Sequence, residues 1–276
     1  MELRPYQVEA VESVFREWEQ GRKRTLLVQA TGTGKTICFA EVVRRVASHG
    51  GRSLILAHRG ELLEQAATKI EQTANLKCAL EKAENTSLNS WTSVTVGSVQ
   101  TLMRESRLSQ FRPDAFDCIV VDEAHHTLAE GYTRILDHFE SANVLGVTAT
   151  ADRADRKDLG EVYDSIAYEY DMAHAINDGY LCPIEAEMVP LQVDLSSVSV
   201  THGDYQAGQL GDALEPYLDA IADAMVTRCQ DRRTVVFLPL IRTAKKFTEK
   251  LIERGLTACE VDGQSEDREE ILSDFN

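Results

Sequence analysis

Residues 30–36 are Ala-Thr-Gly-Thr-Gly-Lys-Thr, and this stretch decides which fold the chain can adopt. An apolar run at 25–29 precedes it, and a segment with helical spacing of apolar residues follows at about 34–48. The two glycines allow the backbone to turn so that several N–H groups face one anion, and a helix N-terminus adds its partial positive charge. We therefore expect a strand, a phosphate-binding loop and a helix.

The side chains of this loop have expected roles in holding a nucleoside triphosphate. Lys35 can bridge the β- and γ-phosphates, which also places it among the catalytic residues, and the Thr36 hydroxyl suits Mg²⁺. The cofactor-binding residues expected here are Thr31, Gly32, Thr33, Gly34, Lys35 and Thr36. The full motif has a glycine where this chain has Gln29, so a glycine-rich turn that matches by chance is the alternative.

A pair of acids directly follows a strand-length segment at 117–121, which is apolar from Cys118 to Val121. Ligands of parallel sheets bind at the carboxyl ends of the strands, so Asp122 and Glu123 would face the crevice that holds the phosphates. Asp122 would hold Mg²⁺, directly or through water, and Glu123 would orient and deprotonate the attacking water. A surface turn with ordinary acids is the alternative interpretation. His125 could couple this site to a second domain, whereas His126 is expected to be structural or solvent-facing.

The order of patterns along the chain predicts an α/β fold. Strand-length apolar runs alternate with segments of helical period over about residues 1–150, which favours a parallel sheet with helices on both faces. The expected division is an ATP-binding domain at 1–160, a connecting region at 161–229 and the start of a second α/β domain at 230–276. In that last part, strands are expected at 234–238 and 258–261.

Composition excludes some classes of protein and leaves others open. Hydrophobic residues make up 43% of the chain, as in ordinary globular proteins, and the net charge of −16 argues against a surface coated with cations. Scattered cysteines without a Cys-x-x-Cys pair favour buried thiols, with Cys38, Cys118 and Cys259 as small core residues. No leader-like or membrane-spanning apolar run is visible, so we expect a cytoplasmic protein without a membrane partner.

The two motifs, in this order, resemble those of superfamily 2 helicases and translocases with an Asp-Glu-Ala-His box. The opening Leu-Arg-Pro-Tyr-Gln at 3–7 resembles their adenine-recognition element, which implies that Gln7 reads the base and that Arg4 belongs to the cofactor site. The sequence is most similar to the motor subunits of type I and III restriction enzymes (ResIII-like) and to RadD-like DNA-repair ATPases. Both share the Arg-Pro-Tyr-Gln opening and the Ala-His-Arg segment at 57–59.

The resemblance also assigns roles to weaker motifs. It implies nucleic-acid contacts for Arg59, Ser98 and Thr101, and coupling of hydrolysis to domain movement for His125, Thr148 and Thr150. Each has a structural alternative. Arg59 could cap a strand, Ser98 and Thr101 could cap the next helix, and the last two threonines could simply end a strand.

The resemblance as a whole implies an α/β fold in which a RecA-like P-loop NTPase domain is followed by an incomplete second RecA-like domain. It implies ATP and Mg²⁺ as cofactors. It also implies a nucleic-acid partner, with DNA favoured over RNA. The family's Gln-x-x-Gly-Arg-x-x-Arg motif has no match in this sequence. We therefore expect slow turnover, with the rest of the second domain lying beyond this sequence or in another polypeptide. The alternatives are an ATP-binding conformational module without hydrolysis and another P-loop class, such as a nucleotide kinase or a transporter ATPase.

Overall fold

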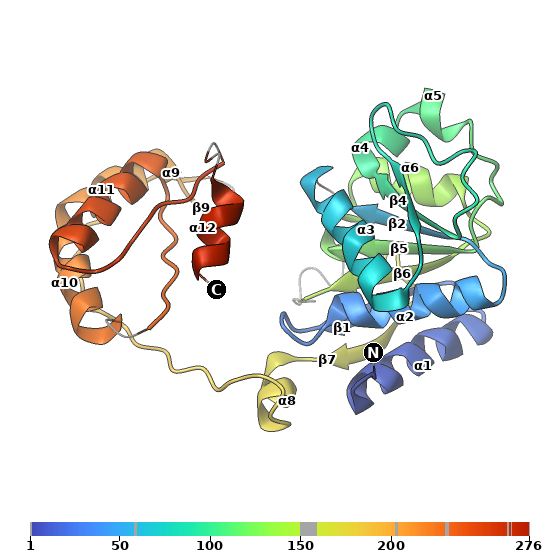
Figure 1. The fold of residues 1–276 in the computed structure, drawn as a ribbon, viewed down its shortest axis with the longest axis horizontal. Coiled ribbons are helices and arrows are strands. Elements are labelled where there is room, and N and C mark those ends of the chain that lie inside the picture. Colours follow the sequence, from blue (N-terminus) through green and yellow to red (C-terminus); the bar gives the residue numbers. More distant parts are fainter. Residues whose placement is uncertain are drawn as a thin grey trace. The chain divides into compact units, whose positions relative to one another are not determined.

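The computed structural model describes residues 2–57, 60–149, 159–201, 204–229, 232–263, 265 and 267–275. The chain forms two compact units, Met1–Ile184 and Glu185–Asn276, which can be followed by colour in Figure 1. The first unit carries every described residue of the expected nucleotide site. Each unit is described by itself below.

A parallel sheet of seven strands forms the centre of the first unit, as the alternating pattern predicts. In their order across the sheet, the strands are β3 (Cys78–Glu81), β4 (Val94–Ser98), β2 (Ser53–Ala57), β5 (Cys118–Asp122), β6 (Asn143–Thr148), β1 (Arg24–Gln29) and β7 (Ser165–Tyr170). All six neighbouring pairs are parallel. The α/β fold class with a RecA-like sheet is therefore confirmed.

Helices cover both faces of this sheet, because strand residues alternate between two apolar cores. One core packs against α1 (Pro5–Glu19), α2 (Lys35–Ser48) and α3 (Gly60–Ala74). The other packs against α4 (Val99–Leu102), α5 (Glu105–Leu108) and α6 (Glu130–His138). A single 3₁₀ turn, η1 (Ala124–His126), follows β5, and α8 (Met172–Asn177) follows β7.

The first unit extends beyond residue 160, where the sequence suggests a boundary. Strand β7 pairs with β1, and the compact unit continues to Ile184. The region expected to connect two domains, 161–229, is thus divided between the two units. Only one residue of β7, Tyr170, is fully buried, which explains why its apolar pattern is weak in the sequence.

The second unit consists mainly of helices in the part that the structure describes. Its elements are β8 (Val200–Thr201), β9 (Asp204–Tyr205), α9 (Ala207–Leu214), η2 (Glu215–Tyr217), α10 (Leu218–Cys229), α11 (Ile241–Glu253) and α12 (Arg268–Phe275). A small core of Leu218, Ala222, Phe247 and Leu251 joins α10 to α11. A row of exposed ion pairs runs beside this core: Arg242–Asp212, Lys246–Glu215, Lys250–Asp219 and Arg254–Asp223.

The two strands expected in this unit are not formed. Residues 234–238 and 258–261 have no strand assignment, and the side chains of Val235 and Phe237 are 62% and 92% exposed. A strand requires a hydrogen-bonded neighbour, and among the described residues none lies beside these apolar runs. The expectation of strands here is therefore corrected.

Two smaller expectations concern cysteines and membranes. Cys38 and Cys118 are buried as expected, whereas Cys259 is exposed and does not belong to a core. The described cysteines are free thiols. Among the helices of the described residues, none has both the length and the apolar character that a membrane crossing needs.

The close contact between Gly146 of β6 and the Tyr163 ring leads to a prediction about stability. Gly146 lies in β6 against the buried ring of Tyr163, and a Cβ at this position would overlap that ring. We expect Gly146→Ala to lower the free energy of unfolding by about 1–3 kcal/mol. Urea unfolding followed by the fluorescence of Trp18 and Trp91, both in the first unit, measures this change.

The matched control is the same substitution in a Tyr163→Leu background. There the alanine should cost less, because the ring that it overlaps is gone. An equal cost in both backgrounds would show that the overlap is not the cause.

Candidate functional site

Sheet order brings the two main motifs to one place. The phosphate loop follows β1 and the acidic pair ends β5, and both strands pair with β6. The register sets Val28 of β1 opposite Thr148, and Asp122 of β5 opposite Val147. Thr148, buried at the carboxyl end of β6, therefore lies between the two motifs.

The loop has the backbone shape that an anion site needs. Gly32 and Gly34 have φ angles of +88° and +86°, which side chains with a Cβ rarely adopt. The Thr33 hydroxyl donates to the Ala30 carbonyl at 2.7 Å, so this threonine holds the turn. Lys35 opens α2, and the exposed Thr31 and half-buried Thr36 flank the turn. The N–H groups at this helix start are available to phosphate oxygens.

Lys35 lies within electrostatic reach of both acids. Its Nζ donates to the Gln29 carbonyl at 3.3 Å. Burial lowers the pKa of Lys35, and the charges of Glu123 and Asp122 oppose this shift. The lysine of the loop and the acids after β5 therefore face a common space, which is the arrangement that a nucleotide with a bound metal requires.

Asp122 and Glu123 differ in their surroundings. Asp122 is half-buried, and its Oδ1 accepts a hydrogen bond from the Glu123 N–H at 3.0 Å. Burial raises the pKa of Asp122, the neighbouring Glu123 charge raises it further, and Lys35 opposes the rise. Glu123 itself is exposed and has a left-handed backbone, with φ of +54°. This geometry turns its carboxylate out of the strand, where water can approach it.

The donor set at this point fits a hard divalent cation. Burial disfavours the ionised form of Asp122, and the neighbouring carboxylate of Glu123 repels it. A bound divalent cation would offset both the cost of burial and this repulsion. Oxygen ligands such as Asp122 and the Thr36 hydroxyl are those that Mg²⁺ prefers. The described residues contain no cluster of three His, Cys, Asp or Glu side chains that would hold a metal without a nucleotide.

The histidines after the acids lie on the 3₁₀ turn η1. His125 Nδ1 is 3.6 Å from Glu123 Oε2, and the His125 and His126 rings are 4.1 Å apart between centroids. Both side chains are exposed, in agreement with the solvent-facing position expected for His126. Coupling through His125 stays a prediction.

The first turn of α1 is hydrogen-bonded to the phosphate loop. Tyr6 Oη and Gln7 Nε2 both donate to the Thr33 carbonyl, at 2.7 and 3.1 Å. Gln7 Oε1 accepts from the Arg4 N–H at 2.9 Å, so the buried amide group is bonded at both ends. The expected cofactor residues Arg4 and Gln7 are thus next to the loop, and base recognition by Gln7 stays a prediction.

An aromatic cluster beside the loop joins Tyr6 of the opening motif to two tyrosines that no sequence motif marks. The Tyr6 ring stacks on Tyr170 at 4.4 Å and meets the edge of Tyr180 at 4.8 Å. The Arg4 guanidinium lies over the Tyr180 ring at 5.0 Å. The Leu181 side chain lies 3.0 Å from where a Cβ on Gly32 would be. Tyr170, Tyr180 and Leu181 fall in the expected connecting region, so only their structural position reveals them.

The residues expected to contact nucleic acid are partly engaged in the fold. Ser98 is buried at the start of α4, without a hydrogen bond from its hydroxyl to that helix, so it does not act as a side-chain cap. The hydroxyl of buried Thr101 accepts from the Ala83 N–H at 3.1 Å. Arg59 and Thr150 lie outside the described residues. The nucleic-acid role of all three contact candidates stays a prediction.

Together, the parallel sheet, the glycine turn that opens α2 and the acids after β5 define a P-loop protein of the helicase type. Comparison with known proteins agrees with this class. The family model described as Type III restriction enzyme, res subunit, matches residues 1–153, and the chain belongs to this family. The predicted likeness to superfamily 2 helicases and restriction motor subunits is thus confirmed.

Individual relatives show the same likeness. IRC3 of Saccharomyces cerevisiae, whose name assigns it to the ATP-dependent helicases, is 34% identical over 226 residues, which cover 77% of this chain and 32% of IRC3. The type I restriction enzyme EcoAI endonuclease subunit of Escherichia coli is 28% identical over 265 residues, which cover 93% of this chain and 32% of that subunit.

A solved structure extends the likeness to the fold. A fragment assigned to the HsdR subunit of a type I restriction enzyme from Vibrio vulnificus YJ016 has a TM-score of 0.69 at 25% identity, covering 91% of this chain and 45% of the fragment. The chain therefore spans about a third to a half of the length of these relatives, 32% to 45%.

The raised pKa of Asp122 predicts a trade between stability and function. When the pKa of a carboxyl is higher in the folded than in the unfolded protein, the free energy of unfolding falls as the pH rises from the unfolded-state pKa through the folded-state pKa. At neutral pH the ionised carboxylate of Asp122 therefore destabilises the folded protein. We expect Asp122→Asn to raise the thermal unfolding midpoint in nucleotide-free buffer and to abolish the further rise caused by Mg²⁺–ATP. A lower midpoint in nucleotide-free buffer would contradict this account. Asp137→Asn, at an exposed acid away from the site, is the control.

Proposed function

We propose that this chain is the first motor domain of a DNA helicase or translocase, and that it binds and hydrolyses ATP with Mg²⁺. The observation that carries the proposal is the convergence of Lys35, Asp122 and Glu123 around the carboxyl end of β6. Among P-loop proteins, this arrangement supports hydrolysis of the γ-phosphate. Family membership supports the motor class.

Each residue has a defined task in the proposed reaction. The N–H groups of the loop and the Lys35 ammonium hold the phosphates, and Lys35 neutralises charge on the transferring group. Asp122 and Thr36 would hold Mg²⁺, which supplies further charge neutralisation when bound. Glu123 orients a water molecule and accepts its proton, a task for which its exposed position after the strand is suited.

The nucleic-acid substrate and the need for a complete second domain are also proposals. The restriction-enzyme subunits among the relatives favour DNA over RNA. Rapid turnover in two-domain motors needs both domains to close on ATP, and this chain spans only part of its relatives. We therefore propose slow turnover for the chain alone, with a further segment or another polypeptide supplying the rest of the second domain. The cytoplasmic location expected from the sequence remains a prediction.

The acidic pair gives the test of hydrolysis. We expect Glu123→Gln to lower steady-state ATPase, measured with and without single-stranded and duplex DNA, by about 10²–10⁴-fold, because proton acceptance from water is lost. The affinity for Mg²⁺–ATP should change little. Glu130→Gln, on the exposed start of α6, is the matched control.

If Glu123→Gln leaves the rate unchanged, hydrolysis by this site is excluded. Nucleotide binding without any turnover, even with DNA present, would favour a purely conformational role for ATP.

The aromatic cluster gives a test that separates base from phosphate binding. Tyr180 is half-exposed beside Arg4 and the loop, where a stacked base would contact it. We expect Tyr180→Ala to weaken ATP binding by about fivefold to a hundredfold, the range of base–aromatic stacking, without changing affinity for inorganic tripolyphosphate. Calorimetric titration of both ligands measures this. Equal losses for both would mean that Tyr180 supports only the loop, and Tyr205→Ala in the second unit is the control.

A further inference from the structure

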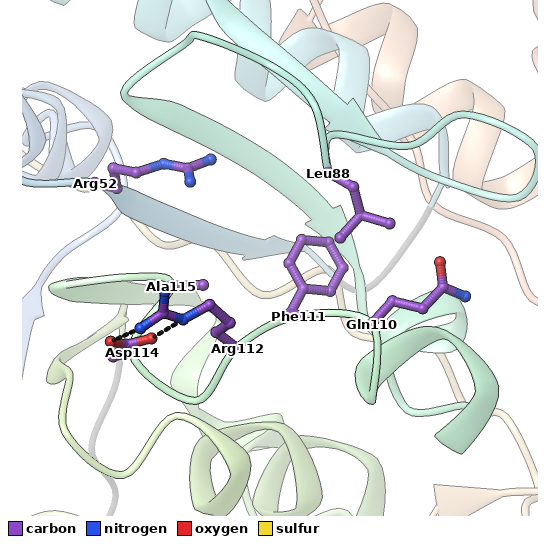
Figure 2. A pocket seen from close by; sticks show the side chains of 7 residues that line it. All are labelled: Arg52, Leu88, Gln110, Phe111, Arg112, Asp114 and Ala115. Atoms are coloured by element: carbon purple, nitrogen blue, oxygen red, sulfur yellow. Dashed lines mark hydrogen bonds and ion pairs between the residues drawn. The ribbon is translucent and has the colours of Figure 1, made fainter.

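A hollow of about 370 Å³ lies in the first unit, away from the nucleotide site. The residues that line it are Arg52, Leu88, Gln110, Phe111, Arg112, Asp114 and Ala115 (Figure 2). Arg52 directly precedes β2, whereas the phosphate loop and the acids follow the ends of β1 and β5. Because all strands are parallel, the hollow lies at their amino ends and the nucleotide site lies at their carboxyl ends.

One guanidinium of the hollow has no ion-pair partner among the described side chains. Arg112 is neutralised by Asp114, with hydrogen bonds of 2.9 and 2.8 Å. The guanidinium of Arg52 instead lies over the Phe116 ring at 5.6 Å, and no carboxylate of the described residues pairs with it. Only the backbone N–H of Arg52 is bonded to an acid, Asp117, at 2.8 Å. Half-buried on an aromatic ring, this guanidinium is positioned to bind a carboxylate through two parallel hydrogen bonds.

The apolar part of the hollow is packed against the core of the first unit. Phe111 is 6% exposed and packs against Phe116 and Phe139, with centroids 6.0 and 6.3 Å apart. Leu88 packs against the same core from the loop that leads to β4. An apolar side chain that enters from outside would therefore meet preformed partners and would not have to order them.

A fully exposed tryptophan lies three residues after Leu88 in the sequence. Trp91 is fully exposed, at 102% of its reference area, on the loop that carries Leu88. Hydrogen bonds order the chain on both sides of it: Thr92 N–H donates to Ser90 Oγ at 3.2 Å, and Thr92 Oγ1 donates to the Val94 carbonyl at 3.0 Å. The end of the loop is bonded to the start of β2 beside Arg52, through Ser53 N–H to Ser93 O at 2.8 Å. Large aromatic side chains that remain exposed on ordered loops are typical of interaction sites.

We propose that this surface, formed by Arg52, Leu88, Trp91, Gln110 and Phe111, binds a partner protein through an extended segment that carries a carboxylate next to an apolar side chain. The carboxylate pairs with Arg52, the apolar side chain enters between Leu88 and Phe111, and Trp91 covers the segment from the side. A nucleic-acid backbone is disfavoured, because it needs several free cations and the lining residues offer one.

Tryptophan emission tests the proposal in the whole chain. The sequence has two tryptophans, and Trp18→Phe leaves Trp91 as the sole reporter. This change is mild, because the buried Trp18 Nε1 has no hydrogen-bond partner in the described residues. The probe is a short acetylated and amidated peptide with aspartates on both sides of a leucine. The control peptide has the same length and end groups, with lysines in place of the aspartates.

We expect a saturable change in Trp91 emission with the acidic peptide and none with the basic peptide. Arg52→Gln should weaken binding about tenfold or more, since a charged hydrogen-bonded pair is lost. Arg104→Gln, at an exposed arginine outside the surface, should bind as the parent does.

Three results would each overturn the proposal: no binding of the acidic peptide, equal binding of both peptides, or unchanged binding by Arg52→Gln. If duplex DNA changes the emission and Arg52→Gln removes that change, the surface is a nucleic-acid site and the proposal is also wrong. Because no residue of the nucleotide site is involved, these outcomes do not depend on ATP binding or hydrolysis.

Discussion

The pairing of β6 with both β1 and β5 is the constraint on which the nucleotide site depends. This register fixes where each strand ends, and so brings a lysine and two acids from distant parts of the sequence into one electrostatic environment. Lys35 and Asp122 are both partly buried there, and burial disfavours the charged form of each. Neither is neutralised by the other in a direct ion pair among the described contacts. The fold thus keeps a lysine and two acids close together without direct ion pairs between them. A triphosphate could pair with the lysine, and its cation could pair with the acids.

The phosphate loop is also constrained from outside the motif. Tyr6 and Gln7 of α1 both donate to one carbonyl of the loop, and the Gln7 amide lies 2.7 Å from the position of a Cβ on Gly34. Glycine at this position therefore serves two purposes, a left-handed backbone and a close approach of the first helix. The Tyr6–Tyr170 stack, of a kind worth about 0.5–1.5 kcal/mol, holds the same region against the edge strand β7. The loop is supported on two sides before any ligand arrives.

The sequence was sufficient to predict the central strands and the main motif residues, for physical reasons. Strands such as β2 and β5 are buried on both faces and appear as continuous apolar runs, and the glycine loop and acidic pair lie in short segments that local geometry largely determines. Sequence patterns did not predict the elements whose formation or position depends on contacts with distant parts of the chain. Edge strand β7 has little apolar signal, residues 234–238 have an apolar run without a neighbouring strand, and Tyr180 reaches the site only through the path of the folded chain. The engagement of Thr101 could likewise not be predicted, because its hydroxyl bonds to Ala83 in a loop from elsewhere in the sequence.

One backbone hydrogen bond connects the loop to the way the chain leaves the first unit. The Ala30 N–H, at the first position of the glycine turn, donates to the Tyr170 carbonyl at 3.0 Å, and Tyr170 ends the strand that leads through α8 to Leu181. Leu181 then returns to touch Gly32. The turn and the chain that follows β7 are therefore in contact at two points, at Tyr170 and at Leu181. A displacement of the turn would therefore also alter its contacts with the end of β7 and with Leu181, which belong to the same compact unit.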